Sequence, residues 1–168
     1  MANCFSSTLA GISMECQATR GGIVEVLISK ADGVSAATDS DDSTVTGVTG
    51  GTWKRYEFRK NTGSMTSTFN PDDANGNNVS TELVLQFSRM DTAKRIEMNA
   101  LSLQDLVCIV TDANGTHWYL GKDVPVSATA GNGQTGTART DGNFYTLTLT
   151  DSSVTWPYTF TGTLPTVS

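Results

Sequence analysis

The stretch Thr81-Glu-Leu-Val-Leu-Gln-Phe-Ser88 decides the fold class, because apolar and polar side chains alternate along it. Leu83, Leu85 and Phe87 fall on one face of an extended chain, whereas the opposite face is polar. Asn143-Phe-Tyr-Thr-Leu-Thr-Leu-Thr150 repeats the alternation, with a ladder of threonines on its polar face. Both stretches are therefore predicted to be strands that bury one face.

Further strands are expected on either side of these two. The run from Gly22 to Ser29 is almost continuously apolar, and the run from Trp53 to Lys60 alternates Tyr56 and Phe58 with charged side chains. Asn114-Gly115 tolerates the positive φ angles of a tight turn. It is therefore predicted to join strands at 107–111 and 116–120 into a hairpin.

The last strand and the only expected helix have distinct signals. Trp156–Phe160 alternates aromatic residues around Pro157, which lacks an amide donor and predicts a sheet edge or a bulge. Asp91 is a suitable N-cap for a helix that continues to about Leu103. The apolar face of that helix is expected to carry Ala93, Ile96, Ala100 and Leu103.

Polar segments complete the fold prediction. The stretches 31–51 and 70–78 are expected to be long loops, and Gly131-Asn-Gly-Gln-Thr-Gly136 an ordinary flexible loop. The last stretch has the glycine spacing of a dinucleotide-binding loop, but a strand follows it where that motif needs a helix. The chain is thus predicted to be mainly β, a sandwich or barrel of about seven or eight strands with one flanking helix.

Length and charge narrow the function classes. The 168 residues suit a single domain, 1–168, with residues 1–20 as an N-terminal arm. The net charge of −6 opposes non-specific attraction to nucleic acid or anionic lipid. The sequence shows neither a secretory signal nor an apolar run of the ~20 residues that span a bilayer, so we expect a protein with no membrane anchor.

The three cysteines are too few for a disulfide scaffold. Cys108 lies in an apolar strand and is expected to be an inert core residue. Cys4 and Cys16 would pair only in an oxidising compartment, and two free thiols are the preferred interpretation.

Residues that carry catalysis are not singled out by the sequence. The only histidine, His117, is expected to be structural, and the loop around Gly76 fails as an EF-hand because Pro71 occupies the first ligand position. Asp39, Asp41 and Asp42 are expected to be solvated, with weak cation binding as the alternative. We therefore predict no enzymatic activity, no cofactor and no metal site.

Several runs together resemble a known family. Tyr56–Thr68, Val79–Glu97, Val110–Gly121, Gly133–Gly136 and Tyr145–Leu149 are similar, in this order, to virion structural proteins of tailed bacteriophages, especially those that infect Bacteroidetes. The resemblance implies a tail-tube-like fold whose copies form rings around a channel for DNA. It leaves open whether the rings build a long tail tube, a connector between portal and tail, or an auxiliary part of the capsid.

The resemblance also implies partners and a location. We expect a homo-oligomeric ring that contacts portal or tail components and assembles in the bacterial host cytoplasm into the virion. Duplex DNA would be a non-specific passenger in the channel, whose lining is expected to be net acidic so that DNA slides. A capsid decoration protein and a surface or glycan-binding β-sandwich module are the alternatives.

The candidate self-assembly residues are Arg59, Lys60, Met65 and Phe69. They belong to an expected hairpin through Asn61-Thr-Gly63, with Met65 and Phe69 on one side of its second strand. Exposed strands pair readily across chains, so this hairpin is predicted to contact a neighbouring copy.

Overall fold

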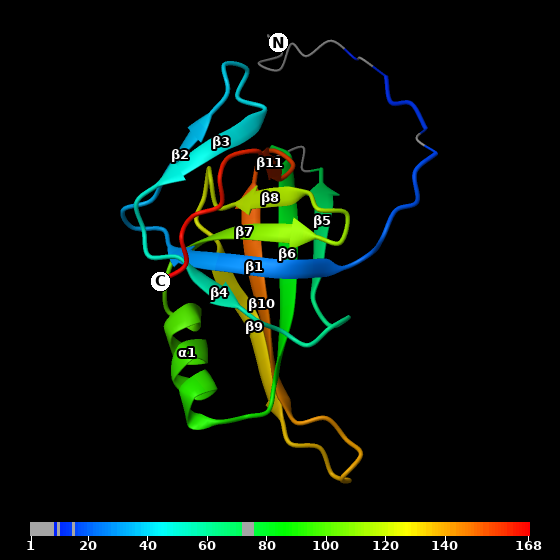
Figure 1. The fold of residues 1–168 in the computed structure, drawn as a ribbon, viewed down its shortest axis with the longest axis vertical. Coiled ribbons are helices and arrows are strands. Elements are labelled where there is room, and N and C mark those ends of the chain that lie inside the picture. The colour runs from blue at the N-terminus through cyan, green and yellow to red at the C-terminus, as the bar shows by residue number, and fades with distance from the viewer. Residues whose placement is uncertain (1–8, 10, 15, 72–75) are drawn as a thin grey trace.

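The computed structural model of the chain describes residues 9, 11–14, 16–71 and 76–168, which form two packed β-sheets beside one helix (Figure 1). The elements in chain order are β1 (Ile23–Lys30), β2 (Ser35–Thr38), β3 (Thr44–Thr49), β4 (Lys54–Tyr56), β5 (Ser64–Asn70), β6 (Asn78–Ser88), α1 (Thr92–Ser102), β7 (Leu106–Asp112), β8 (His117–Leu120), β9 (Ser127–Gln134), β10 (Phe144–Ser153) and β11 (Tyr158–Phe160).

The sheets form an open sandwich and not a closed barrel. One sheet has seven strands in the order β2-β3-β11-β8-β7-β1-β4, and the other has four in the order β5-β6-β10-β9. Neighbouring strands are antiparallel, except that β11 runs parallel to β3. The mainly-β prediction with one helix is confirmed.

The main core lies between the sheets and follows the predicted alternation. In β6, Leu83 and Leu85 are fully buried and Phe87 nearly so, and β10 contributes Leu147 and Leu149 opposite them. These side chains pack against the facing side of β1 and β7. Period-two alternation therefore identified the buried face of both long strands.

A second core covers the other face of the seven-stranded sheet. β7 contributes Leu106, Cys108 and Val110 to the main core, and Val107 and Ile109 to the second one. Because both faces of β7 are buried, its sequence is continuously apolar instead of alternating. The other buried members of the second core are Leu27, Val45, Trp53, Tyr119 and Phe160.

The expected helix exists, but the face predicted for it is wrong. Asp91 is the N-cap and accepts a hydrogen bond of 2.8 Å from the amide of Lys94. The buried side chain is Leu101, whereas Ile96 and Leu103 expose 58 % and 85 % of their surface. Helical spacing alone selected the apolar residues that face outward, because a helix at the side of a sandwich buries only a narrow stripe.

The segment 31–51, expected to be a loop, holds the β2–β3 hairpin. Only part of that segment is apolar, but Val45 of β3 is fully buried in the second core. β3 pairs with β11, which satisfies backbone hydrogen bonds of β3. Because this partner is distant in sequence, the small, polar side chains of the segment do not indicate a strand. The segment 70–78 holds a loop as far as the structure describes it.

Two further strand predictions need correction. Residues 131–134, expected to be part of a flexible loop, extend β9, because the paired strand β10 supplies the ladder. β11 lies inside its sheet, between β3 and β8, and not at an edge. Pro157 precedes the first residue of β11, so its missing amide removes no hydrogen bond from the ladder.

Candidate assembly surface

The candidate assembly surface is the free edge of β5, defined here as the β5 edge (residues 64–70). β5 pairs with β6 on one side, and among the described residues no strand lies on its other side. Met65, Ser67 and Phe69 alternate with exposed polar residues: Ser64, Thr66, Thr68 and Asn70. Such an edge presents unpaired backbone groups on one side, which is the requirement for pairing with another chain.

The two apolar residues of the β5 edge differ in burial. Met65 is half-buried and packs against the main core, whereas Phe69 exposes 46 % of its surface. Between them the Ser67 hydroxyl lies 2.9 Å from the Thr81 hydroxyl of β6. Phe69 is therefore the residue of this strand with apolar surface to offer a partner, while Met65 serves the fold.

The expected hairpin that leads into β5 is a crossover between the sheets. β4 belongs to the seven-stranded sheet and pairs with β1, while β5 belongs to the four-stranded sheet. A turn does occur, because the Thr62 amide donates to the Arg59 carbonyl at 3.1 Å and Asn61 has a φ of 62°. The hairpin prediction is therefore wrong in its pairing although the turn is present.

Gly63 permits this crossover. A Cβ added there would lie 2.6 Å from Phe58 Cε2 and 2.7 Å from Ile23 Cγ1. The backbone thus passes close to side chains of the core as the chain changes sheets.

Arg59 and Lys60 lie exposed in the turn that precedes the β5 edge, and Phe69 lies near the far end of that edge. A seven-residue strand is roughly 23 Å long. The structure therefore does not bring the four predicted residues into one patch: the charged pair and the exposed aromatic lie at opposite ends of the edge. The Arg59 amide donates to the Gln86 carbonyl of β6 at 3.1 Å, which fixes the turn against the sheet.

The chain before β1 is a second candidate assembly feature, which the sequence interpretation named only as an arm. In Figure 1 residues 11–14 and 16–20 lead away from the start of β1 and arch out from the sandwich. Leu9, Ile12 and Met14 expose 97 %, 103 % and 96 % of their surfaces. The signal that could have identified a binding element is the alternation of Ile12, Met14, Cys16 and Ala18 with polar residues.

The root of this arm is fixed to the β7–β8 hairpin. The Arg20 amide donates to Asn114 Oδ1 at 2.8 Å, and Asn114 Nδ2 donates to the Arg20 carbonyl at 3.2 Å. The Ala113 amide also donates to the Gly22 carbonyl at 3.0 Å. The turn predicted at Asn114-Gly115 is confirmed, and it also anchors the arm.

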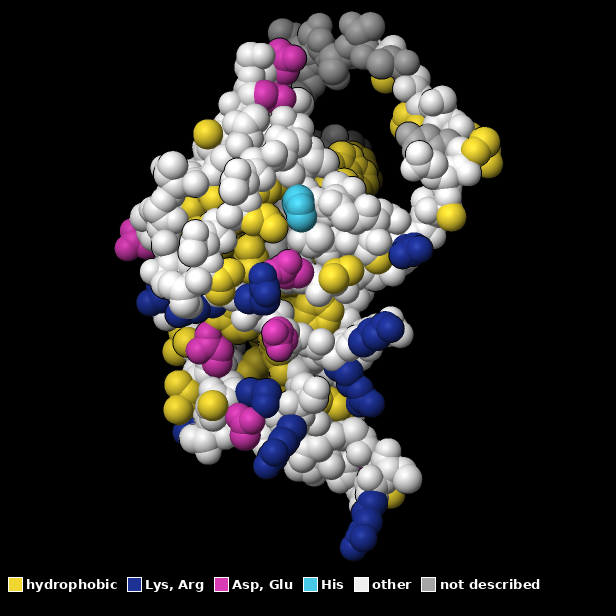
Figure 2. All heavy atoms as spheres, in the orientation of Figure 1, with side chains coloured by type: hydrophobic (Ala, Val, Ile, Leu, Met, Phe, Trp, Pro, Cys, Tyr) yellow, Lys and Arg dark blue, Asp and Glu magenta, His cyan; other side chains and the backbone are white. Residues whose placement is uncertain are grey.

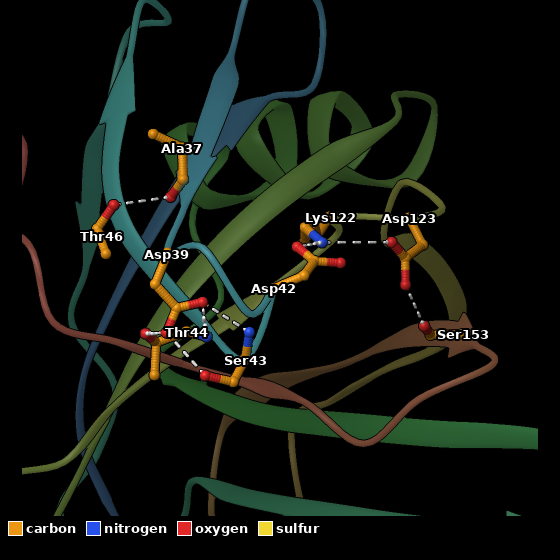
Figure 3. Close-up of polar contacts among 9 residues, drawn as sticks. All are labelled: Ala37, Asp39, Asp42, Ser43, Thr44, Thr46, Lys122, Asp123 and Ser153. Atoms are coloured by element: carbon orange, nitrogen blue, oxygen red, sulfur yellow. Dashed lines mark hydrogen bonds and ion pairs between the residues drawn. The ribbon is translucent and has the colours of Figure 1, made fainter. Parts of the chain in front are cut away.

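Two carboxylates of the acidic cluster in the β2–β3 hairpin, Asp39 and Asp42, have structural roles (Figure 3). Asp39 accepts hydrogen bonds from the amides of Ser43 and Thr44 at 2.8 and 3.3 Å and from both hydroxyls at 2.7 Å. The hydrogen bonds from Ser43, followed by those from Thr44, hold the pKa of the Asp39 carboxyl well below its usual range. Asp39 thus closes the hairpin instead of being simply solvated.

Asp42 connects this hairpin to the rest of the sandwich. It forms an ion pair of 2.6 Å with Lys122, which follows β8, and Lys122 lies 4.2 Å above the ring centre of Tyr158. The hydrogen bond from Lys122 lowers the pKa of Asp42. Ser153 donates to Asp123 at 3.0 Å beside this pair (Figure 3). The group joins four segments at the surface: the β2–β3 turn, the segment after β8, the end of β10 and the start of β11.

His117 occupies a structural setting in β8. Its Nδ1 lies 2.8 Å from the Thr111 hydroxyl across the strand pair. The nearby carboxylate of Asp112 accepts instead from Trp118 Nε1 at 3.1 Å and from two turn amides. Asp112 therefore organises the turn and does not orient the imidazole as a catalytic dyad requires.

A groove of about 440 Å³ runs between α1 and the ends of β1 and β4. In its wall the Tyr56 hydroxyl donates to Glu97 of α1. Burial, followed by the contact with Glu97, raises the pKa of the Tyr56 phenol, so the phenol stays protonated at neutral pH. The pair joins the helix to the β4 edge and offers a donor rather than an activated base.

Two buried titratable groups lie in the main core. Cys108 is fully buried, and burial raises the pKa of its thiol, which fits the predicted inert residue. Asp151 of β10 is 6 % exposed, and its Oδ2 accepts from the Gly121 amide at 3.2 Å. Burial raises the pKa of this carboxyl. The Cys4–Cys16 question falls outside the described residues because Cys4 is among those omitted.

Charges are distributed unevenly over the face drawn in Figure 2. Acidic side chains lie at the tip of the β2–β3 hairpin, whereas over the middle of this face and toward α1 acidic side chains alternate with Lys and Arg. Among the residues that the structure describes, no group of three or more His, Cys, Asp or Glu side chains is placed to hold a metal ion. In the same residues no helix has the length and apolar character needed to cross a bilayer.

Comparison with known proteins gives no relatives: no protein-family model, curated protein or solved structure matches the chain significantly.

Proposed function

We propose that this chain is a structural protein of a tailed-bacteriophage virion, without enzymatic activity, whose copies assemble into a ring around a channel for DNA. The family part of the proposal rests on the sequence resemblance of residues 56–149 to such proteins. The assembly part rests on one structural observation, the free β5 edge with the exposed Phe69.

An unpaired, uncharged edge strand supports assembly because proteins that remain monomeric usually protect such edges with charges, prolines or a covering element. Along β5 the side chains are Ser, Met, Thr, Ser, Thr, Phe and Asn, with no charge among them. The β4 edge, in contrast, carries Lys54 and Arg55 and lies beside α1 through the Tyr56–Glu97 contact.

The charge balance supports the passage of DNA rather than its retention. The chain carries 17 acidic and 11 basic residues, and a ring multiplies this excess around its axis. Duplex DNA has about one negative charge per 1.7 Å, so a net acidic lining would not hold it by counterion release. We expect the face that lines the channel to be net acidic.

The test is electron microscopy of the purified protein together with its sedimentation profile. Annular particles or tubes are expected for the wild type. Phe69→Asp should shift the protein to smaller species while leaving it folded, because Phe69 is half-exposed and contributes little to the core. The matched control is Thr68→Asp, which places the same charge on the solvent face of the same strand.

Two outcomes contradict the proposal. A wild type that remains monomeric or trimeric and binds only to preformed capsid shells would favour the decoration protein instead. Rings that persist in Phe69→Asp to the same extent as in Thr68→Asp would exclude the β5 edge as the contact.

A further inference from the structure

The arm before β1 has the alternating sequence of a strand, but its described residues pair with no strand in the part of the chain that the structure describes. Ile12, Met14, Cys16 and Ala18 would share one face of an extended chain, with Ser13, Gln17 and Thr19 on the other. Because burial of apolar side chains is favourable, this alternation indicates a segment whose apolar face is covered by a partner. Yet each of these residues that the structure describes is exposed.

The free edges of the sandwich are unequal as acceptors for this arm. α1 lies beside both β4 and β9. It contacts β4 through the hydrogen bond between Tyr56 and Glu97, and it reaches β9 through Met98, whose Cε would lie 4.0 Å from a Cβ added at Gly131. β2 has only four residues. β5 has seven, and its Phe69 is left partly uncovered.

We propose that residues 12–19 of one copy add as a strand to the β5 edge of a second copy, placing Ile12 and Met14 against the apolar side of β5. This inference rests on the proposed assembly into rings and names the contact that joins the copies. Eight extended residues span about 26 Å and β5 spans about 23 Å, so the two segments match in length. Backbone hydrogen bonds would give affinity, and the alternating apolar side chains would fix the register.

A second copy is the occupant because the chain's own edge is within reach and is not used. A groove beside the arm root is lined by Arg20, Gly22, Ser64 and Met65, so the root lies next to the start of the same chain's β5. From that root, held by Asn114, the arm nevertheless turns away from the body (Figures 1 and 2). An arm that leaves its own edge free gives a head-to-tail contact, which generates rings or tubes when repeated.

The inference is tested with two full-length variants that each remove one half of the contact. Ile12→Asp/Met14→Asp spoils the arm and keeps the edge, whereas Phe69→Asp spoils the edge and keeps the arm. Each is expected to weaken self-association by at least about tenfold, because apolar burial in the contact is lost. Ser13→Asp/Gln17→Asp, with the same added charge on the polar side of the arm, should change association by less than about threefold.

Mixing the two defective variants decides whether the contact is directional. The intact arm of Phe69→Asp should bind the intact edge of Ile12→Asp/Met14→Asp, so sedimentation should show a one-to-one heterodimer that grows no further. A mixture that stays monomeric would overturn the inference. So would wild-type-like rings from Ile12→Asp/Met14→Asp alone.

The same experiment separates this inference from the proposed function. If Ile12→Asp/Met14→Asp still forms rings like those of the wild type, only the arm contact is contradicted. A heterodimer in the mixture, with a wild type that forms only open chains or small oligomers, contradicts the ring and leaves the arm contact in place. Circular dichroism of each variant should match the wild type, since all the substituted side chains are half-exposed or fully exposed.

Discussion

β7 and β5 are both seven residues long and differ in almost everything else. β7 lies inside the seven-stranded sheet with five consecutive buried residues, whereas β5 lies at an edge with no fully buried side chain. Two covered faces and two neighbouring strands make β7 a source of stability. β5 has one neighbouring strand and one half-covered face, so its free edge and Phe69 remain available for other contacts. We expect the contacts between copies there.

The comparison predicts that substitution in β7 costs far more stability than substitution in β5. Ile109→Ala should lower the free energy of unfolding by about 2–5 kcal/mol, because it leaves a cavity beside Tyr119 and Phe160. Thr66→Ala on the exposed face of β5 should change it by less than about 0.5 kcal/mol. Urea denaturation of both proteins provides the measurement, and equal losses would show that the two strands are not stabilised differently.

Stability should be sensitive to substitution at the entry into β5, although it is not at the exposed face of β5. Gly63→Ala is expected to lower the free energy of unfolding by about 1–3 kcal/mol, because the new methyl group meets Phe58 and Ile23. Gly47→Ala is the matched control, since a Cβ at Gly47 meets nothing within 4 Å. Thermal unfolding followed by circular dichroism compares them, and a neutral Gly63→Ala would mean that the crossover is loosely packed.

Within β5 the two apolar residues should separate folding from assembly. Met65→Asp is expected to destabilise the fold, because Met65 packs on the main core, whereas Phe69→Asp should cost less than about 1 kcal/mol. Denaturation and sedimentation are measured on the same samples. If Phe69→Asp were the less stable of the two, the division between a core residue and a contact residue would be wrong.

The smallest effect concerns Asp151, which lies on β10 opposite the core-facing residues of β7. Because burial raises its folded pKa above the unfolded value, the folded chain holds this proton more tightly. The resulting stabilisation is complete below the unfolded pKa of about 3.9 and is lost as pH rises through the folded pKa. Asp151→Asn should therefore gain stability relative to the wild type between pH 3.5 and pH 7, by roughly 1 kcal/mol or less.

Denaturation curves of both proteins at several pH values test this. Because the other carboxylates are common to the two chains, only the difference between them is interpreted. A difference that is constant with pH would show that the folded state does not shift the pKa of Asp151, and one that falls as pH rises would show that it lowers this pKa; either result contradicts the prediction.

The β5 edge shows what a sequence pattern can and cannot say about a site. The alternation in residues 64–70 predicted a strand with Met65 and Phe69 on one side, as observed. It did not show that β5 leaves its expected hairpin for the other sheet, because strand pairing depends on partners distant in sequence. It also could not separate Met65 from Phe69, because burial is decided by what lies across the sandwich. The alternation of apolar residues at 12, 14, 16 and 18 in the arm is a signal of the same kind.

The sequence alone determined the features that arise from local physics. These are the half-buried strands β6 and β10, the Asn114-Gly115 turn and the Asp91 cap, and each depends on residues that are close together in sequence. Only the tertiary structure decided which face of α1 is buried, that the polar segment 35–49 forms a hairpin, and that β11 lies inside its sheet. The physical reason is that a strand's hydrogen bonds and a helix's buried stripe are completed by elements far away in sequence, whose positions no local pattern encodes.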